Sequence, residues 1–214
     1  MFDFQLFLLP LWQTIYMVIA SSALATVFGL PLGVLLFITR SPMIAPQNKL
    51  NRALNGLVSI GRSIPFIILM IALIPFTRAI VGTSIGTTAA IVPLTVCAIP
   101  FLAKVVETAL TEIYPGLIES SISMGASVWQ IVIKVLLPEA LPGLIQGITL
   151  MVINLIAYSA MAGAIGGGGL GDLAIRYGYQ RFNMPIMLAT IVILIVLVQL
   201  TQWLGDYIVK KLRR

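Results

Sequence analysis

The chain has 214 residues, of which 59% are hydrophobic and only 9% are charged; its mean hydropathy of +1.07 excludes an ordinary soluble domain, in which about 25% of residues are charged. The formal charge of +6 arises from lysines and arginines at the ends of apolar stretches, which excludes a basic stripe of the kind that binds nucleic acid. The absence of histidine removes His-based catalysis and most zinc or haem sites, and the single cysteine, Cys97, removes an intrachain disulfide.

Five apolar stretches are long enough to cross a membrane, since a transmembrane helix takes about 20 predominantly apolar residues. We therefore predict an all-α integral membrane protein with five transmembrane helices in a single domain, residues 1–214. The predicted spans cover about residues 12–38, 54–74, 89–106, 144–165 and 185–209. No basic segment precedes the first apolar run, so we expect that run to be a retained span and not a cleaved signal peptide.

Prolines in the second and third predicted spans bear on how those spans pack. Arg62 lies near the start of the second span and Pro65 lies inside it, and a Gly- and Thr-rich turn region, residues 75–88, follows. In the third span, Pro93 and Pro100 are seven residues apart and share one helix face. A proline-bearing face needs protein neighbours for its freed carbonyls, so we predict that this face packs or bends and does not meet lipid.

The lysines and arginines predict the orientation. Five spans place the termini on opposite sides, and cytoplasmic segments carry the excess of positive charge. With the C-terminus in the cytoplasm, ten of the 13 cations fall on the inner side: Arg40, Lys49, Arg52, Arg62, Lys104, Lys134, Lys210, Lys211, Arg213 and Arg214. We therefore expect the N-terminus outside and the C-terminus in the cytoplasm.

A half-polar segment, Glu119 to Gly143, separates the third and fourth spans and is cytoplasmic in this orientation. Ile118, Ile122, Gly125 and Trp129 follow one another at spacings of four, three and four, which predicts one face of a helix, and Pro138 is expected to end the segment. A short hairpin with Gly125 at its bend would suit a groove on a soluble partner, whereas a helix in the membrane interface would show the same periodicity. Periodicity does not decide between the two.

The same segment resembles the signature of ABC importer permeases, which reads EAA, three residues, G, nine residues, I-x-LP. The matching positions are Glu119, Ser120, Ser121, Gly125, Val135, Leu137 and Pro138. Two serines stand for the alanines and a valine for the isoleucine. The resemblance implies a type I ABC importer permease fold and coupling helices that dock on a cytoplasmic ATPase, with Glu119 meeting a basic group there. The implied coupling residues are Glu119, Ser120, Ser121, Gly125, Ala126, Trp129, Leu137 and Pro138.

Five further blocks are similar to the methionine uptake permeases: RSIPFIIL (62–69), IPFTRAIVGTSIG (74–86), AAIVPLT (89–95), VLLPEALPGL (135–144) and YSAMAGAIGGGGLGD (158–172). This resemblance implies a subunit that moves methionine, D- and L-forms included, into the cytoplasm through the bacterial inner membrane by alternating access. The implied partners are two ATPase subunits, a second copy of the chain, an extracytoplasmic methionine-binding protein and lipid. The chain has no G-x-x-x-x-G-K-[ST] phosphate loop, so we expect no catalytic residue or cofactor in it, and ATP and Mg²⁺ are expected on the ATPase.

Polar residues in the fourth span are the candidate substrate contacts, because such residues tend to face a bundle interior or an aqueous path. Asn154, Tyr158 and Met161 share one helix face, and Ser159 adjoins them. A thioether beside an aromatic ring and an amide suits methionine, although a Tyr and a Met at this spacing also suit ordinary packing. The resemblance favours Tyr158 and Met161 first, then Ser159 and Asn154.

The glycine tract after the fourth span contains G-L-G-D, residues 169–172, which superficially matches the GxGD of intramembrane aspartyl proteases. Those enzymes need a second intramembrane aspartate, and the other two, Asp3 and Asp206, are near the chain ends. We predict instead a flexible outer cap that meets a binding protein.

Two alternative functions stay open: an ABC importer permease for another small amino acid or metabolite, and a channel or carrier that works without ATP. The coupling signature, the lack of internal repeats and the scarcity of intramembrane acids argue against the second.

Overall fold

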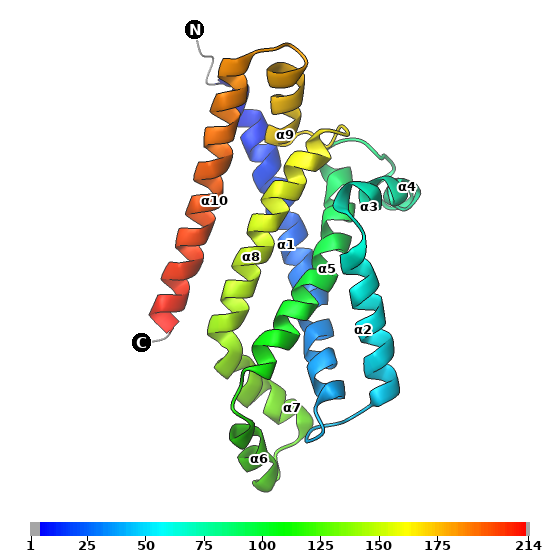
Figure 1. The fold of residues 1–214 in the computed structure, drawn as a ribbon, viewed down its shortest axis with the longest axis vertical. Helices are drawn as coiled ribbons and strands as arrows, with labels where there is room; N and C mark the ends of the chain where they lie inside the picture. Colours follow the sequence, from blue (N-terminus) through cyan, green and yellow to red (C-terminus); the bar gives the residue numbers. More distant parts are fainter. Residues whose placement is uncertain (1–4, 213–214) are drawn as a thin grey trace.

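The computed structural model describes residues 5–212, and every regular element within this range is helical, which confirms the predicted all-α class (Figure 1). Most helices run roughly along the long axis of the molecule, and a small hairpin lies at one end. The elements are α1 Gln5–Arg40, α2 Asn48–Ser63, α3 Phe66–Ala72, α4 Ile74–Val81, α5 Thr87–Thr111, α6 Pro115–Ser123, α7 Val128–Ile131, π-helix η1 Val132–Leu136, α8 Leu137–Gly163, α9 Gly169–Leu173, π-helix η2 Ala174–Tyr179 and α10 Met184–Leu212.

Four helical stretches are long and apolar enough to cross a membrane: α1, α5, Val128–Gly163 and α10. The predicted second span is divided between two helices, α2 and α3. Helices α2 and α3 together could make a fifth span, but they are bent by 102° at their junction. The bend has a local cause, because Pro65 offers no N–H and disfavours the helical conformation at Ile64, whose ψ is 123°.

The core of the bundle is formed by α1, α5 and α8, which approach closely at glycines. A Cβ on Gly33 of α1 would lie 2.5 Å from Cβ of Val106 and 2.6 Å from the carbonyl oxygen of Ala103, both on α5. A Cβ on Gly147 of α8 would lie 2.1 Å from Cγ1 of Val105. Small residues at such positions allow helices in a membrane to gain contact area. Pro93 and Pro100 are both buried here, as predicted.

The glycine tract, predicted to be a flexible outer cap, is a packed and hydrogen-bonded element, which corrects the prediction of flexibility. It turns at residues 164–168 and forms α9, where Gly169, Leu170 and Gly171 are buried. The N–H of Gly169 donates to Oε1 of Gln13 at 2.9 Å, and the N–H of Leu170 donates to Oγ1 of Thr14 at 2.9 Å. Asp172 accepts a hydrogen bond from Arg176 in the next turn. The bonds to Gln13 and Thr14 attach α9 to α1, the first helix of the bundle.

Candidate functional site

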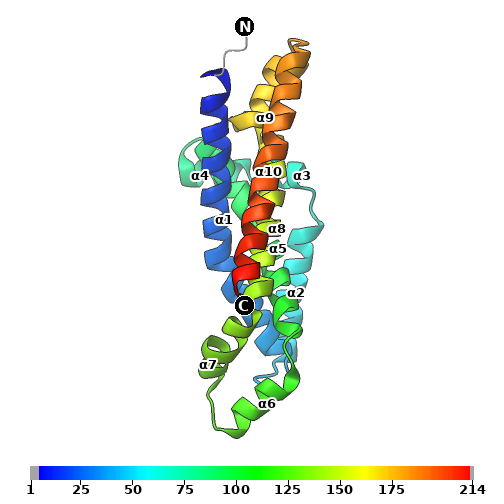
Figure 2. The ribbon, with the colours of Figure 1, turned by 90° about the vertical axis from the view of Figure 1, so that its left-hand side faces the viewer.

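Helices α6 and α7 form a hairpin that projects beyond the long helices at one end of the molecule (Figures 1 and 2). Ile118, Ile131 and Val132 are buried and belong to the main hydrophobic core, so the inner side of the hairpin is anchored to the bundle. Met124 and Trp129 are 80% and 70% exposed, and Glu119 and Ser120 are also exposed. The hairpin therefore offers an outward surface that combines large apolar side chains with a carboxylate.

The bend of the hairpin is a specific helix-ending motif. The N–H of Gly125 donates to the carbonyl of Ile122 at 2.9 Å, and the N–H of Ala126 donates to the carbonyl of Ser121 at 3.1 Å, which is the Schellman pattern. Gly125 has φ of +78°, a conformation that favours glycine. The prediction of Gly125 at the bend is confirmed; within the chain its positive φ, and not crowding, favours glycine, because no atom lies within 4 Å of where its Cβ would be.

The helix that follows the bend begins with a capping box, in which the hydroxyl of Ser127 and the side chain of Gln130 each bond the other residue's backbone N–H. The bend separates Ile118 and Ile122 on α6 from Trp129 on α7, so the prediction that these residues share one helix face was wrong. Ser121 is buried and donates its hydroxyl proton to the carbonyl of Leu117 at 2.7 Å. Ser121 therefore supports the hairpin from inside.

Pro138 does not end the segment, which corrects a further prediction. The chain stays helical from Val128 to Gly163, and Pro138 is in the first turn of α8. The π-helix η1 precedes it, and the N–H of Leu137 donates to the carbonyl of Val132, five residues back. A wider π-turn changes the local pairing of carbonyls, which allows a helix to accept a proline that cannot donate. Leu137 and Pro138 thus lie on the stem between the hairpin and the bundle.

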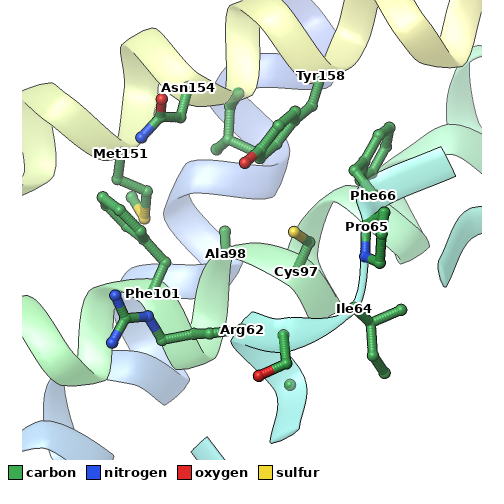
Figure 3. Close-up of a pocket in the computed structure, with 13 residues that line it drawn as sticks. Arg62, Ile64, Pro65, Phe66, Cys97, Ala98, Phe101, Met151, Asn154 and Tyr158 are labelled. Atoms are coloured by element: carbon green, nitrogen blue, oxygen red, sulfur yellow. The ribbon is translucent and has the colours of Figure 1, made fainter. Parts of the chain in front are cut away.

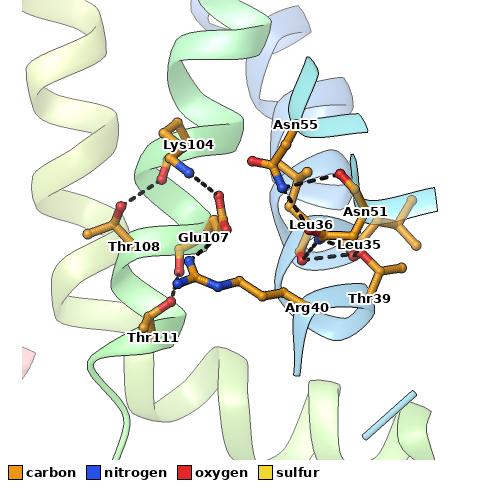
Figure 4. A network of polar contacts seen from close by, with 10 residues as sticks. All are labelled: Leu35, Leu36, Thr39, Arg40, Asn51, Asn55, Lys104, Glu107, Thr108 and Thr111. Atoms are coloured by element: carbon orange, nitrogen blue, oxygen red, sulfur yellow. Dashed lines mark hydrogen bonds and ion pairs between the residues drawn. The ribbon is translucent and has the colours of Figure 1, made fainter. Parts of the chain in front are cut away.

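A polar network joins α1, α2 and α5 above the hairpin (Figure 4). Glu107 is buried, and its carboxylate lies 3.3 Å from the guanidinium of Arg40 and 2.7 Å from Nζ of Lys104. The side-chain amide of Asn51 donates to the carbonyl of Leu36 at 2.8 Å and to Oγ1 of Thr39 at 2.9 Å. The sequence reasoning missed this network; its signal was a lone acid, Glu107, directly after the predicted third span.

A cavity of about 320 Å³ lies where α2, α5 and α8 meet at the bend between α2 and α3 (Figure 3). Of the predicted substrate residues, Asn154 and Tyr158 line it. The ring of Tyr158 stacks on that of Phe66 with centroids 4.8 Å apart and planes 13° apart. The remaining wall comes mainly from Arg62, Pro65, Cys97, Phe101 and Met151. Apolar, aromatic and sulfur-bearing side chains thus surround a few polar groups.

The other two predicted substrate residues do not line this cavity. Met161 is 42% exposed on the surface of α8, and Ser159 is buried and donates its hydroxyl proton to the carbonyl of Ile156 at 2.7 Å. Arg62, which we counted among the cytoplasmic cations, lies in the last turn of α2 beside the bend and lines the cavity. Sequence reasoning missed its place in the cavity, although Pro65 three residues later was the signal for a broken helix.

Comparison with known proteins gives three findings. Residues 29–214 match the family model of the binding-protein-dependent transport system inner membrane component. The chain is 54% identical over 207 residues to a probable D-methionine transport system permease protein MetI of Vibrio cholerae, covering 97% of this chain and 92% of that one. It is 58% identical over 152 residues to the D-methionine transport system permease protein MetI of Escherichia coli K12, covering 71% and 70% of the two chains.

Solved structures show the same fold. A chain of the MetNI methionine ABC transporter in inward-facing conformations superposes with a TM-score of 0.93 at 54% identity, covering 95% of this chain and 94% of that chain. A chain of an amino acid ABC transporter crystallised with histidines superposes with a TM-score of 0.79 at 17% identity, covering 99% of each chain, which supports the fold alone.

Proposed function

The chain belongs to the family of binding-protein-dependent transport system inner membrane components, and on that premise we propose that it is the permease subunit of an ATP-driven methionine importer. The observation that carries the proposal is the match, in sequence and fold and over nearly the whole chain, to the permease chain of a methionine ABC transporter. The helical hairpin supports the same function, because it presents an exposed surface for a soluble partner at one end of the spans.

The energy for transport comes from two copies of a separate cytoplasmic ATPase, which bind ATP and Mg²⁺. Each hairpin enters a groove on one ATPase, with Glu119, Ser120 and Trp129 on the contacting side and the Gly125 turn at the tip. Ala126 continues the turn, Ser121 holds it from inside, and Leu137 and Pro138 connect it to α8. When ATP draws the ATPases together, the hairpins move and the helices rock from an inward-open to an outward-open arrangement.

Two copies of the chain form the transport path about a two-fold axis, the commonest symmetry of identical subunits. Asn154 and Tyr158 contact methionine in the cavity of each copy. Met161 and the neighbouring Ser159 are further along α8, where the exposed Met161 is available to a path between the copies. Thioether and aromatic groups attract a methionine sulfur modestly, which suits transient contacts along a path.

The proposed setting is the bacterial inner membrane, with the N-terminus outside, the C-terminus in the cytoplasm and an extracytoplasmic methionine-binding protein delivering the substrate. Without Arg62, nine of the remaining cations still fall on the cytoplasmic side against three on the outer side, Arg78, Arg176 and Arg181. The hairpin then faces the ATPase, and the end that carries α9 faces the binding protein.

The proposal is tested by uptake of labelled methionine into liposomes that contain this permease with its cognate ATPase, with binding protein outside and ATP inside. We expect accumulation that requires ATP and is competed by unlabelled methionine but not by alanine. ATP hydrolysis stimulated by the binding protein, without methionine uptake, would redirect the proposal to another small amino acid or metabolite. Uptake that is equal with and without ATP would overturn the importer mechanism.

A further inference from the structure

Arg62 is an exposed cation at the edge of the cavity, and it has no anionic partner among residues 5–212. It is in the last turn of α2, and its guanidinium lies at the cavity beside Phe101 (Figure 3). Within residues 5–212, the ion pairs involve Arg40, Lys104 and Arg176, and Arg62 takes part in no ion pair. A charged side chain at membrane depth is costly, so an unpaired one marks a functional site.

The depth of Arg62 follows from the register of α2. Asn51 is fixed beside Leu36 and Thr39 near the cytoplasmic end of α1. Arg62 is eleven residues further along the same helix, which places it about 16 Å deeper. With Asn51 placed at the cytoplasmic boundary of a hydrocarbon core about 30 Å thick, Arg62 lies near the middle of that core. Its neighbour Gly61 abuts Pro100, since a Cβ there would lie 3.1 Å from Cγ of that proline.

No acid of the described chain can neutralise Arg62 at this depth. Glu107 already binds Arg40 and Lys104, and Asp172 binds Arg176 at the opposite end. Glu112, Glu119 and Glu139 belong to the hairpin end, and Asp206 accepts a hydrogen bond from Gln202 on α10. None of the described acids lies at the cavity, so an anion that binds Arg62 there comes from outside residues 5–212.

The C-terminal end of α2, where the helix breaks, supplies partial negative charge at the cavity. Helix α2 has 16 residues and ends at Ser63, and Gly61, Arg62, Ser63 and Ile64 line the cavity. The last carbonyls of a helix lack intrahelical partners and form the negative end of its dipole. Broken helices in transporters use such ends near the membrane centre to hold cations. The cavity thus has a guanidinium for an anion and helix-end carbonyls for a cation.

The rest of the cavity is fitted to an apolar side chain. Phe66 and Tyr158 form a stacked aromatic wall, and Met151 and Cys97 add sulfur atoms. The volume of about 320 Å³ is at the small end of the range of about 300–1,000 Å³ for small-molecule sites, which suits one amino acid and not a long peptide or an oligosaccharide.

We infer that this cavity is a zwitterion site in which Arg62 binds the α-carboxylate of the transported amino acid. The C-terminal carbonyls of α2 bind its ammonium group, and its side chain lies against Phe66, Tyr158 and Met151. This inference rests on the proposed function and adds to it the group that recognises the shared backbone of amino acids. Arg62 sets the requirement for a carboxylate, whereas the aromatic and sulfur wall sets the side-chain preference.

The test uses the complete assembly in liposomes, with Arg62→Gln, Arg62→Lys and, as a matched loss of charge on the same helix, Arg52→Gln. Arg52 is exposed and does not line the cavity. For each assembly, methionine uptake and ATP hydrolysis stimulated by the loaded binding protein are measured side by side. We expect Arg62→Gln to lower uptake at least about tenfold while hydrolysis stays within about twofold, because a charge-assisted hydrogen bond is lost only at the substrate.

Arg62→Lys keeps the cation and should recover part of the uptake, and Arg52→Gln should match the unaltered assembly. Uptake by Arg62→Gln within about twofold of the unaltered assembly would overturn the inference and leave the proposed function standing. A parallel loss of hydrolysis and uptake in both Arg62 variants would overturn it in favour of a structural role. If the unaltered assembly accumulates no methionine, the proposed function fails and the inference fails with it.

Discussion

Helices α5 and α10 are both apolar enough to cross a membrane, yet the bundle uses them in opposite ways. In the most apolar stretch of α5, 61% of the residues are buried. In that of α10, the more apolar helix of the two, only 6% of the residues are buried. Helix α5 carries Pro93, Cys97, Pro100 and Glu107, and α10 packs mainly against one side of α8 (Figures 1 and 2). Lipid tails are as apolar as leucine, so hydropathy gives no preference for burial. Close approach at glycines of its neighbours, Gly33 of α1 and Gly147 of α8, places α5 in the core.

The largest effect on stability is expected where α5 meets α1. Gly33→Leu would place side-chain atoms where Val106 and the Ala103 carbonyl already lie, so the two helices must separate. We expect the free energy of unfolding in detergent to fall by about 3 kcal/mol. The control is Gly56→Ala, because a Cβ there would meet no atom within 4 Å. The unfolding midpoint of this variant should not fall. An unchanged midpoint for Gly33→Leu would contradict the close contact.

Truncating one leucine in each helix tests the comparison directly. Leu102 of α5 is 1% exposed and Leu200 of α10 is 58% exposed. We expect Leu102→Ala to cost about 2 kcal/mol because it leaves a cavity in a packed core, and Leu200→Ala to cost less than about 0.5 kcal/mol. Denaturant titration of both variants gives the difference. Equal costs would show that α10 is packed as tightly as α5.

A smaller effect is expected from the acids of the two helices. Glu107→Gln removes the carboxylate that Arg40 and Lys104 share, and we expect a loss of about 1.5 kcal/mol from the weakened charge-assisted bonds. Asp206→Asn on α10 changes an exposed group and should alter stability by less than about 0.5 kcal/mol. The same titration measures both. The comparison fails on this point if Asp206→Asn costs as much as Glu107→Gln.

The smallest effect on stability is expected at exposed tryptophans, and here a second assay separates two kinds of exposure. Trp129 of the hairpin is 70% exposed and Trp203 of α10 is 66% exposed. Neither change to alanine should alter the unfolding midpoint measurably. Trp129→Ala should weaken association with the ATPase about tenfold, since buried aromatic anchors dominate interfaces, whereas Trp203→Ala should not. Equal ATPase affinity for both variants would remove Trp129 from the interface.

The sequence was sufficient for features that depend on local chemistry. Hydropathy located the long apolar helices, paired prolines predicted the buried face of α5, and a glycine with polar neighbours predicted the bend at Gly125. Each of these follows from short-range constraints on backbone conformation or on transfer into lipid. The coupling signature likewise depends on spacing within one segment.

The features that sequence reasoning missed depend on contacts between distant segments or on small differences in helical pairing. The glycine tract was predicted to be flexible, but its amides are bonded to Gln13 and Thr14, more than 150 residues away. Pro138 was predicted to end a segment, but a π-turn accommodates it. The cavity unites Arg62, Cys97 and Tyr158 from three helices, and no periodicity within one helix predicts that meeting.

The helix is continuous from Val128 to Gly163, so part of the hairpin and part of the cavity wall belong to one helical element. Trp129 lies in the hairpin part of this element and Tyr158 in the cavity wall, with η1 between them. A flexible loop between them would not transmit a displacement of the hairpin, whereas a hydrogen-bonded helix transmits it to the cavity wall. Each residue advances a helix by about 100°, so removing one residue from η1 would rotate the hairpin about the axis of α8 by about that angle. The helix would become only slightly shorter.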